Sequence, residues 1–138
     1  MFIVEGDAAW CAALRQTFLP YKDKVEIIQK YLSDISDDAH ITLKDLFEQY
    51  SIYKVDFLKM DIEGYEKRAL CGGVIGDGVN FVGIDKMAIC TYHNSDDEFD
   101  FSNFVSRYGY KFYLTDGYMV LLDSDEFPIR KAILRVYK

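Results

Sequence analysis

An apolar run that changes abruptly into a cluster of acids constrains the fold of this chain most strongly. Residues 55–58 read Val-Asp-Phe-Leu, and residues 59–66 follow as Lys-Met-Asp-Ile-Glu-Gly-Tyr-Glu. We predict a buried strand over 55–60 and a helix that begins near Glu63. In an open α/β sheet, ligands bind outside the carboxyl ends of the strands. Asp61 and Glu63 are expected at such an end, beside the free N–H groups of a helix N-terminus.

Helix capping is the other explanation for these acids. An acid near a helix N-terminus stabilises the helix by about 0.3–1 kcal/mol, which accounts well for Glu63 or Glu66. It accounts less well for Asp61 and Lys59, because these residues fall within the strand or at its very end. We expect Lys59 to form an ion pair with nearby acids.

Composition indicates one ordinary domain over residues 1–138. The formal net charge of −7 disfavours nucleic acid and anionic membranes as partners. Cys11, Cys71 and Cys90 are widely spaced and include no Cys-x-x-Cys pair, so we expect reduced, mostly buried thiols. No apolar run approaches the ~20 residues that a membrane-spanning helix needs. These features are typical of a cytoplasmic protein.

The first half of the chain alternates between strand and helix patterns. We expect a strand at Phe2–Val4, a second at 25–28 that continues weakly through 31–32, and a surface loop over 33–40. Two helices are predicted in this half, each with an N-terminal cap. The first follows Asp7 and ends at Pro20, with Trp10, Ala13, Leu14 and Phe18 on one apolar stripe; the second follows Thr42, with Asp45 completing a capping box.

The second half continues the alternation. The helix after Glu63 is expected to end at Gly72-Gly73. The near-continuous apolar run 86–92 predicts a strand covered on both faces, as in a parallel sheet. A helix over 99–108 should follow, then a hairpin in which 110–114 and 118–122 flank an Asp-Gly turn, then a last strand over 129–137. This order predicts an α/β fold, mostly parallel with an antiparallel C-terminal hairpin.

Several of these segments together resemble the FkbM-type family of S-adenosylmethionine-dependent methyltransferases. The most specific element is Lys-x-Asp-x-Glu-Gly-x-Glu at 59–66. The resemblance also runs through Thr42-Leu43-Lys44-Asp45-Leu46, Leu70-Cys71-Gly72-Gly73, Ala88-Ile89-Cys90-Thr91-Tyr92-His93 with Asp96 and Asp97, Gly109-Tyr110 and Gly117-Tyr118-Met119. It implies a Rossmann-like class I methyltransferase sheet and methylation of an oxygen on a sugar, a polyketide or another small-molecule hydroxyl, a glycan included.

The resemblance also implies roles for individual acids. Glu5, at the end of the first strand, matches the acid that binds the ribose hydroxyls of S-adenosylmethionine, although an exposed loop acid would look the same. Asp34 and Asp61 complete the expected cofactor-binding set. Asp61 and Glu63 would bind the acceptor, position its hydroxyl or hold a divalent ion; the metal requirement stays open, and we assign no metal ligand.

His93 follows the next strand and is the other candidate for a base beside Asp61. A neutral imidazole accepts protons near physiological pH. A polar residue that leaves a strand and bonds a backbone carbonyl explains His93 equally well. His40 lies in an acidic loop and is expected to be solvated, whereas Tyr65 and Tyr92 are expected in the core or the pocket wall.

One departure from the family pattern concerns the start of the chain. These methyltransferases begin with a strand and a Gly-x-Gly-type loop that approaches the cofactor, and glycine permits that close approach. Here Gly6 stands alone after what aligns as the second strand, and Gly76 and Gly78 follow a helix. We expect the first strand to be missing, either because the chain is a C-terminal fragment or because the sheet has closed the gap.

Two further hypotheses remain. A non-catalytic remnant would keep the fold without cofactor affinity, and the missing glycine loop favours it. A phosphoacceptor receiver domain would use Asp61 as its aspartate and Thr91 as the hydroxyl that ends the next strand. The receiver also requires a Lys-Pro pair after a fifth strand, and the sequence has none.

Overall fold

The computed structural model describes residues 1–74, 83–120 and 129–138 and divides into two compact units. The first unit holds residues 1–51 together with 68–74. The second holds residues 52–67 and the described residues from 83 onward. We describe each unit by itself.

In the first unit, two parallel strands are joined through a helix. Strand β1 (Phe2–Glu5) pairs in parallel with β2 (Glu26–Gln29), and Glu5 lies opposite Gln29. Helix α1 (Ala8–Thr17) connects them and contacts β2, followed by the short 3₁₀ helix η1 (Leu19–Tyr21). Asp7 caps α1 as predicted, since its carboxylate accepts the N–H groups of Ala9 and Trp10.

The predicted apolar stripe of α1 is wrong. Trp10 is 66% exposed, and the fully buried residue of this helix is Cys11, whose thiol donates to the carbonyl of Glu5. A small side chain that faces β1 therefore fixes the orientation of the helix, and the large aromatic ring remains in solvent.

The rest of the first unit contains a short parallel pair and a second helix. Strand β3 (Tyr31–Leu32) pairs with β4 (His40–Ile41), so the predicted loop 33–40 ends in a strand. Helix α2 (Leu43–Gln49) begins after Thr42, whose hydroxyl accepts the N–H of Asp45. The capping box is incomplete, because the hydroxyl of Ser36 accepts the N–H of Thr42 and itself donates to the carboxylate of Asp45.

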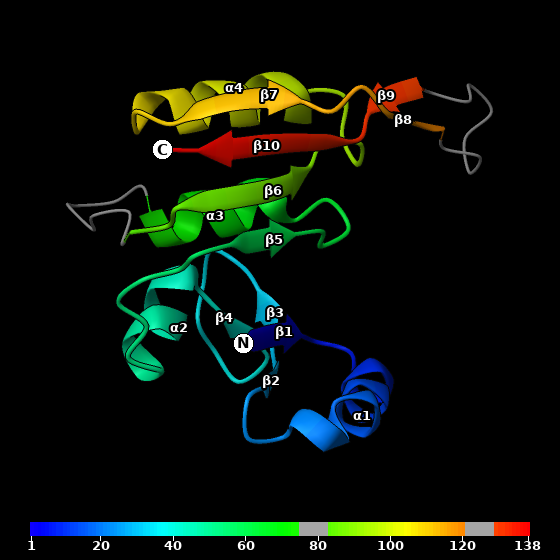
Figure 1. Ribbon diagram of the computed structural model, residues 1–138, viewed down its shortest axis with the longest axis vertical. Helices are drawn as coiled ribbons and strands as arrows, with labels where there is room; N and C mark the ends of the chain where they lie inside the picture. The colour runs from blue at the N-terminus through cyan, green and yellow to red at the C-terminus, as the bar shows by residue number, and fades with distance from the viewer. Residues whose placement is uncertain (75–82, 121–128) are drawn as a thin grey trace. The chain divides into compact units, whose positions relative to one another are not determined.

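A four-stranded sheet forms the second unit, in the order β5-β6-β10-β7 (Figure 1). Strand β5 (Leu58–Met60) runs parallel to β6 (Lys86–Cys90). Strand β10 (Ile133–Tyr137) is antiparallel to both β6 and β7 (Lys111–Leu114). Three strands therefore share one direction, and β10 is inserted between two of them in the opposite direction.

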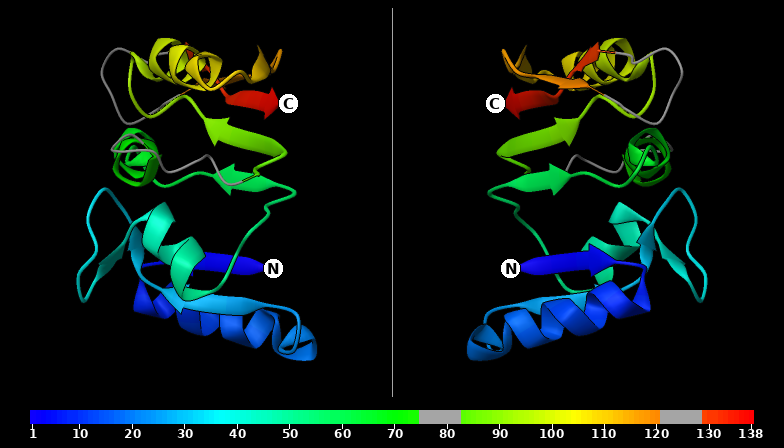
Figure 2. Two further views of the ribbon diagram at one scale, coloured as in Figure 1. Left: turned by 90° about the vertical axis from the view of Figure 1, so that its left-hand side faces the viewer. Right: turned by 90° about the vertical axis from the view of Figure 1, so that its right-hand side faces the viewer.

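The second unit's core consists of apolar side chains from the sheet and from one helix. Helix α4 (Asp97–Arg107) contacts β7 and β10 and lies along one face of the sheet (Figures 1 and 2). It buries Phe101, Phe104 and Val105, and β10 alternates buried Leu134 and Val136 with more exposed residues. Strand β6 is buried from Met87 to Cys90, as its apolar run predicts.

The predicted Asp-Gly hairpin is wrong. Strand β8 (Tyr118–Val120) pairs with β9 (Ile129–Lys131), and β7 pairs with β10. The N–H of Thr115 donates to the carbonyl of Ile133 and the N–H of Ala132 to that of Gly117. Both segments therefore pair with the returning chain, because longer ladders there outweigh the local turn signal. Residues 121 and 122 of the predicted strand lie outside the described part.

Two predictions for the motif region also need correction. Strand β5 covers only Leu58–Met60, at an edge of its sheet, and Phe57 is 52% exposed, so the expected burial fails for most of this run. Helix α3 (Glu66–Val74) begins three residues later than expected. It continues through the predicted stop at Gly72-Gly73.

Candidate functional site

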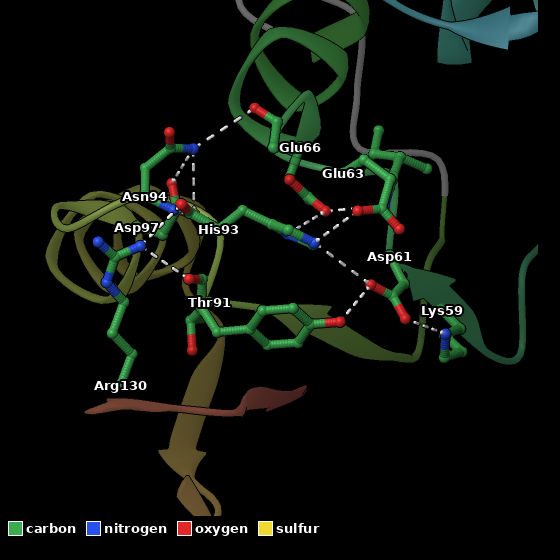
Figure 3. A network of polar contacts seen from close by, with 12 residues as sticks. Lys59, Asp61, Glu63, Glu66, Thr91, His93, Asn94, Asp97 and Arg130 are labelled. Atoms are coloured by element: carbon green, nitrogen blue, oxygen red, sulfur yellow. Dashed lines mark hydrogen bonds and ion pairs between the residues drawn. The ribbon is translucent and has the colours of Figure 1, made fainter. Parts of the chain in front are cut away.

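The ends of β5 and β6 bring together the acids and the histidine. In their parallel register Met60 lies opposite Ile89, so Asp61 leaves the sheet beside the segment that leads to His93. Nε2 of His93 lies 3.8 Å from Oδ1 of Asp61 and 3.6 Å from Oε2 of Glu63. The structure thus gathers all three residues that the sequence suggested as catalytic (Figure 3).

Asp61 is surrounded by donors. The hydroxyl of Tyr92 donates to Oδ1 at 2.8 Å, and the ammonium of Lys59 donates to Oδ2 at 3.0 Å. The ion pair expected of Lys59 is therefore confirmed. Partial burial raises the pKa of Asp61, but the hydrogen bonds of Tyr92, Lys59 and Cys90 outweigh it and leave the pKa below the ordinary 3.8. Asp61 is an oriented anion at neutral pH and a weak proton acceptor.

The pKa values of two groups that donate to Asp61 are raised. Burial raises the pKa of the Cys90 thiol to about 12, and the neighbouring Asp61 carboxylate raises it further. Burial followed by Asp61 also raises the pKa of Tyr92. Both groups therefore keep their protons and can donate to Asp61 across the physiological range. Tyr92 is part of the polar site, in addition to any wall that it forms.

The turn between β5 and α3 directs Glu63 outward. Glu63 has φ +57° and Gly64 φ +90°, so two consecutive residues adopt the left-handed region. A Cβ on Gly64 would meet both the amide nitrogen of Asn94 and Cβ of His93 at 3.4 Å. Glycine therefore permits this turn, because its backbone conformation is unfavourable for a residue with a Cβ. The side chain of Glu63 is 91% exposed, and it lies beside His93 without a fixed partner among the described residues.

Glu66 joins the cluster, although the sequence analysis treated it only as a helix cap. Its side chain is fully buried at the first residue of α3. Oε1 accepts the N–H of Ile62 at 2.8 Å and lies 3.2 Å from Nδ1 of His93. Oε2 has no hydrogen-bond partner among the described residues. The last acid of the Lys-x-Asp-x-Glu-Gly-x-Glu element was the available signal.

The imidazole of His93 lies among these carboxylates and is only 12% exposed. Figure 3 shows the ring directed toward Glu66, Glu63 and Asp61. Neither ring nitrogen makes a hydrogen bond with the described residues, although the distance to Glu66 is short enough for one. The ring is therefore close to three acids and aligned with none of them.

Hydrogen bonds involving Arg130 and Asp97 hold the backbone of the loop after β6. Arg130 donates through one guanidinium nitrogen to the carbonyl oxygens of Tyr92 at 2.8 Å and of His93 at 2.7 Å. The N–H of Asn94 donates to Asp97 at 2.8 Å, where α4 begins. These contacts fix the backbone on both sides of His93, so the ring is presented from a rigid segment.

The first unit contains the acids expected to bind the cofactor. Glu5 ends β1, and its carboxylate accepts the N–H of Asp7 at 2.8 Å. Asp34 follows β3, and Arg68 binds its Oδ1 through two nitrogens at 2.9 and 3.1 Å. That hydrogen bonding lowers the pKa of Asp34. A Cβ on Gly6 would lie 2.1 Å from the ring of Tyr31, so glycine here admits that ring against the backbone.

Three other predictions concern residues near these acids. His40 pairs with Asp37 at 2.8 Å and opens β4, so it is not simply solvated. Tyr65 is 52% exposed, so it is not in the core, and its place in a pocket wall stays a prediction. Cys11 and Cys90 are buried free thiols, as expected.

Comparison with known proteins identifies the family. The model of the "Methyltransferase FkbM domain" matches residues 21–113, more than half of the chain, and this range includes the whole cluster around His93. The comparison with curated proteins gave no match. No helix in the described ranges is both long and apolar enough to cross a bilayer.

Two solved structures show the same fold. Methyltransferase FkbM from Methylobacillus flagellatus KT matches 99% of this chain with a TM-score of 0.66 and 22% identity, and the chain spans 36% of that protein. Precorrin-6y C5,15-methyltransferase from Geobacter metallireducens GS-15 matches 99% of this chain with a TM-score of 0.55 and 10% identity, over 67% of its own chain. The mixed α/β fold is that of class I methyltransferases, and the chain belongs to the FkbM methyltransferase family.

Proposed function

We propose that this chain takes part in S-adenosylmethionine-dependent methylation of a hydroxyl oxygen on a small molecule such as a sugar or a polyketide. The observation that carries the proposal is the convergence of Asp61, Glu63 and His93 at the ends of β5 and β6 in a member of this family. Ligands of α/β sheets bind at that edge. Family membership leaves the receiver hypothesis without support.

The reaction needs a group that accepts a proton. When bound, S-adenosylmethionine supplies a methyl group on a sulfonium; the acceptor oxygen forms the new bond to carbon, and the old carbon–sulfur electron pair remains on sulfur. The hydroxyl proton passes to the protein. Asp61 is held as an anion by three donors, so it orients the site and does not act as the base. His93 and the exposed Glu63 are the two groups left to accept the proton.

Of the residues expected to bind the cofactor in the first unit, Glu5 suits the ribose of S-adenosylmethionine and Asp34 does not. A carboxylate at the carboxyl end of a parallel strand accepts hydrogen bonds from ribose hydroxyls, and Glu5 occupies such a position on β1. Asp34 fits less well, because Arg68 already binds its carboxylate. We therefore assign the ribose to Glu5 and propose that Asp34 acts indirectly, through the loop between β3 and β4 that its ion pair with Arg68 of α3 holds.

A hollow beside the end of β6 supports a polar acceptor. It measures about 320 Å³ and is lined by hydroxyl, charged and aromatic side chains, from Thr91, Ser95, Glu98, Tyr118, Ile129, Arg130 and Lys131. The ammonium of Lys131 lies 4.2 Å from the centre of the Tyr118 ring. A few polar groups next to an aromatic face are typical of sites that orient small molecules, and a polyhydroxylated acceptor matches this lining.

Calorimetric titration with S-adenosylmethionine tests the proposal. We expect 1:1 binding to the wild-type chain and at least about tenfold weaker binding to Glu5→Gln, since a charge-assisted hydrogen bond is lost. Glu48→Gln on α2 removes an exposed acid of the same unit and serves as the control. No binding to the wild-type chain, or equal binding to both variants, contradicts the proposal; the former result supports the non-catalytic remnant.

A further inference from the structure

The cluster around His93 holds more negative charge than its neighbours neutralise. Asp61, Glu63 and Glu66 contribute three carboxylates, and Lys59 is the cation that binds one of them. Two further cations in the described part of the chain bind groups outside the three carboxylates. Arg130 donates to the backbone carbonyls behind the ring, and Lys67 pairs with Asp100.

Glu66 makes this imbalance costly, because its carboxylate is fully buried. One oxygen accepts a backbone N–H, and the other has no partner among the described residues. A buried polar oxygen without a partner is unfavourable. A nearby cation would remove that cost.

The ring of His93 makes no hydrogen bond to these carboxylates. Its Nδ1 lies 3.2 Å from Glu66, and its Nε2 lies 3.6 Å from Glu63 and 3.8 Å from Asp61, yet neither nitrogen has a hydrogen-bond partner among the described residues. No hydrogen bond among the described residues therefore occupies either ring nitrogen, and the unprotonated nitrogen of a neutral imidazole can bind a metal ion.

The distances between the possible ligand atoms of this cluster suit a metal ion. One ligand atom from each of Asp61, Glu66 and His93 can be chosen so that all three lie within 4.8 Å of one another. Metal ions bind nitrogen and oxygen ligands at about 2.0–2.2 Å, which places ligands on opposite sides of an ion roughly 4 Å apart. Small side-chain rotations therefore complete the site.

We propose that Asp61, Glu66 and His93 form a binding site for a divalent first-row transition-metal ion. The mixed imidazole and carboxylate ligands favour Mn²⁺ or Zn²⁺ over Mg²⁺ and Ca²⁺, which prefer oxygen ligands alone. Three protein ligands leave coordination positions open, as in catalytic metal sites. The ion neutralises the buried carboxylate of Glu66.

The ion also decides which group accepts the proton. With His93 bound to metal, that role passes to Glu63, whose carboxylate lies 3.6 Å from the ring and faces solvent. An acceptor oxygen on an open position of the ion would lose its proton more readily. This step rests on the proposed methyl transfer, whereas the ion site itself does not.

Titration of the chelator-treated chain with Mn²⁺, followed by electron paramagnetic resonance of the free ion, tests the site without S-adenosylmethionine. Zn²⁺ competition in the same samples shows whether both ions share it. We expect one Mn²⁺ per chain and at least about tenfold weaker binding to Glu66→Gln and to His93→Gln. Glu66→Gln keeps an oxygen that accepts the N–H of Ile62, so the fold is preserved.

The control is Glu48→Gln, which removes the same charge from an exposed position on α2 and should bind Mn²⁺ like the wild type. Absence of stoichiometric binding overturns the inference, and so does equal affinity of Glu66→Gln and Glu48→Gln, which would place the ion on surface acids. Either result leaves the proposed methyl transfer standing, because that proposal is measured separately by cofactor binding.

Discussion

The hydroxyl of Tyr92 donates a hydrogen bond of 2.8 Å to Oδ1 of Asp61 and so joins the ends of two parallel strands. Because Asp61 also binds Lys59, its carboxylate is fixed on both oxygens. The acid that opens the site is therefore rigid, whereas Glu63, two residues later, faces solvent. We propose that the fixed Asp61 orients the site and that the exposed Glu63 accepts the proton.

Replacement of Gly64 by alanine should destabilise the chain by about 1–3 kcal/mol, because φ +90° is unfavourable for a residue with a Cβ. The new methyl group would only reach van der Waals contact with His93 and Asn94, so the loss comes from the backbone conformation. Urea unfolding of Gly64→Ala measures the loss. Gly117→Ala is the control, since a Cβ there meets nothing within 4 Å and the backbone is not in the left-handed region. Equal stability of the two variants would refute the strain argument.

Two substitutions of Glu66 should differ in stability. Glu66→Ala removes the acceptor of the Ile62 N–H, whereas Glu66→Gln retains one. Since a hydrogen bond to a charged or buried group contributes about 1–3 kcal/mol, we expect Glu66→Ala to be the less stable variant by that amount. Chemical unfolding of both, without added metal, gives the difference. If the alanine variant is as stable as the glutamine variant, the hydrogen bond does not support the turn.

Cys90 should resist alkylation in the folded chain. Its pKa of about 12 leaves on the order of one thiolate in ten thousand at about pH 8, and the side chain is buried. Iodoacetamide labelling followed by mass spectrometry should find Cys90 unmodified in buffer and modified in urea. Modification of Cys90 in buffer at the rate seen in urea would show that its site opens readily.

Acid should weaken the start of α2 through Asp45. Hydrogen bonds from the side chains of Ser36 and Thr42 lower the pKa of Asp45 below 3.8. A carboxyl group with a lowered folded-state pKa contributes stability above its unfolded value and loses it as the pH falls through its folded value. Urea unfolding at about pH 6 and about pH 2.5 should therefore show a smaller acid loss for Asp45→Asn than for the wild type. If both proteins lose the same stability at the lower pH, protonation of Asp45 does not contribute to the acid sensitivity.

The sequence predicted the parts of the site that depend on local order. Asp61 and His93 follow two strands with clear apolar patterns, so their shared edge could be inferred. The burial of Glu66 could not, because an exposed helix cap and a buried acid look alike in sequence, and the left-handed turn at Glu63 and Gly64 that precedes it is seen only in the folded chain.

Long-range pairing explains the main errors in the fold. The Asp-Gly pair at 116–117 favours a hairpin locally, but β7 and β8 each pair with the returning C-terminal segment. Gly72 and Gly73 resemble a helix stop, yet α3 continues through both. At the hairpin, pairing with the returning chain outweighs the local turn preference. At Gly72 and Gly73, a cost of about 1 kcal/mol per glycine does not end the helix.

A methyl-transfer assay tests the central claim most directly. It measures the transfer of a labelled methyl group from S-adenosylmethionine to a panel of monosaccharide and polyketide hydroxyls, with and without Mn²⁺. Glu63→Gln should lower the rate at least about a hundredfold and leave the melting temperature unchanged, because its side chain is 91% exposed. Glu48→Gln should transfer methyl groups like the wild type. A Glu63→Gln rate equal to that of the wild type, or a wild-type chain that methylates no hydroxyl in the panel, would contradict the account.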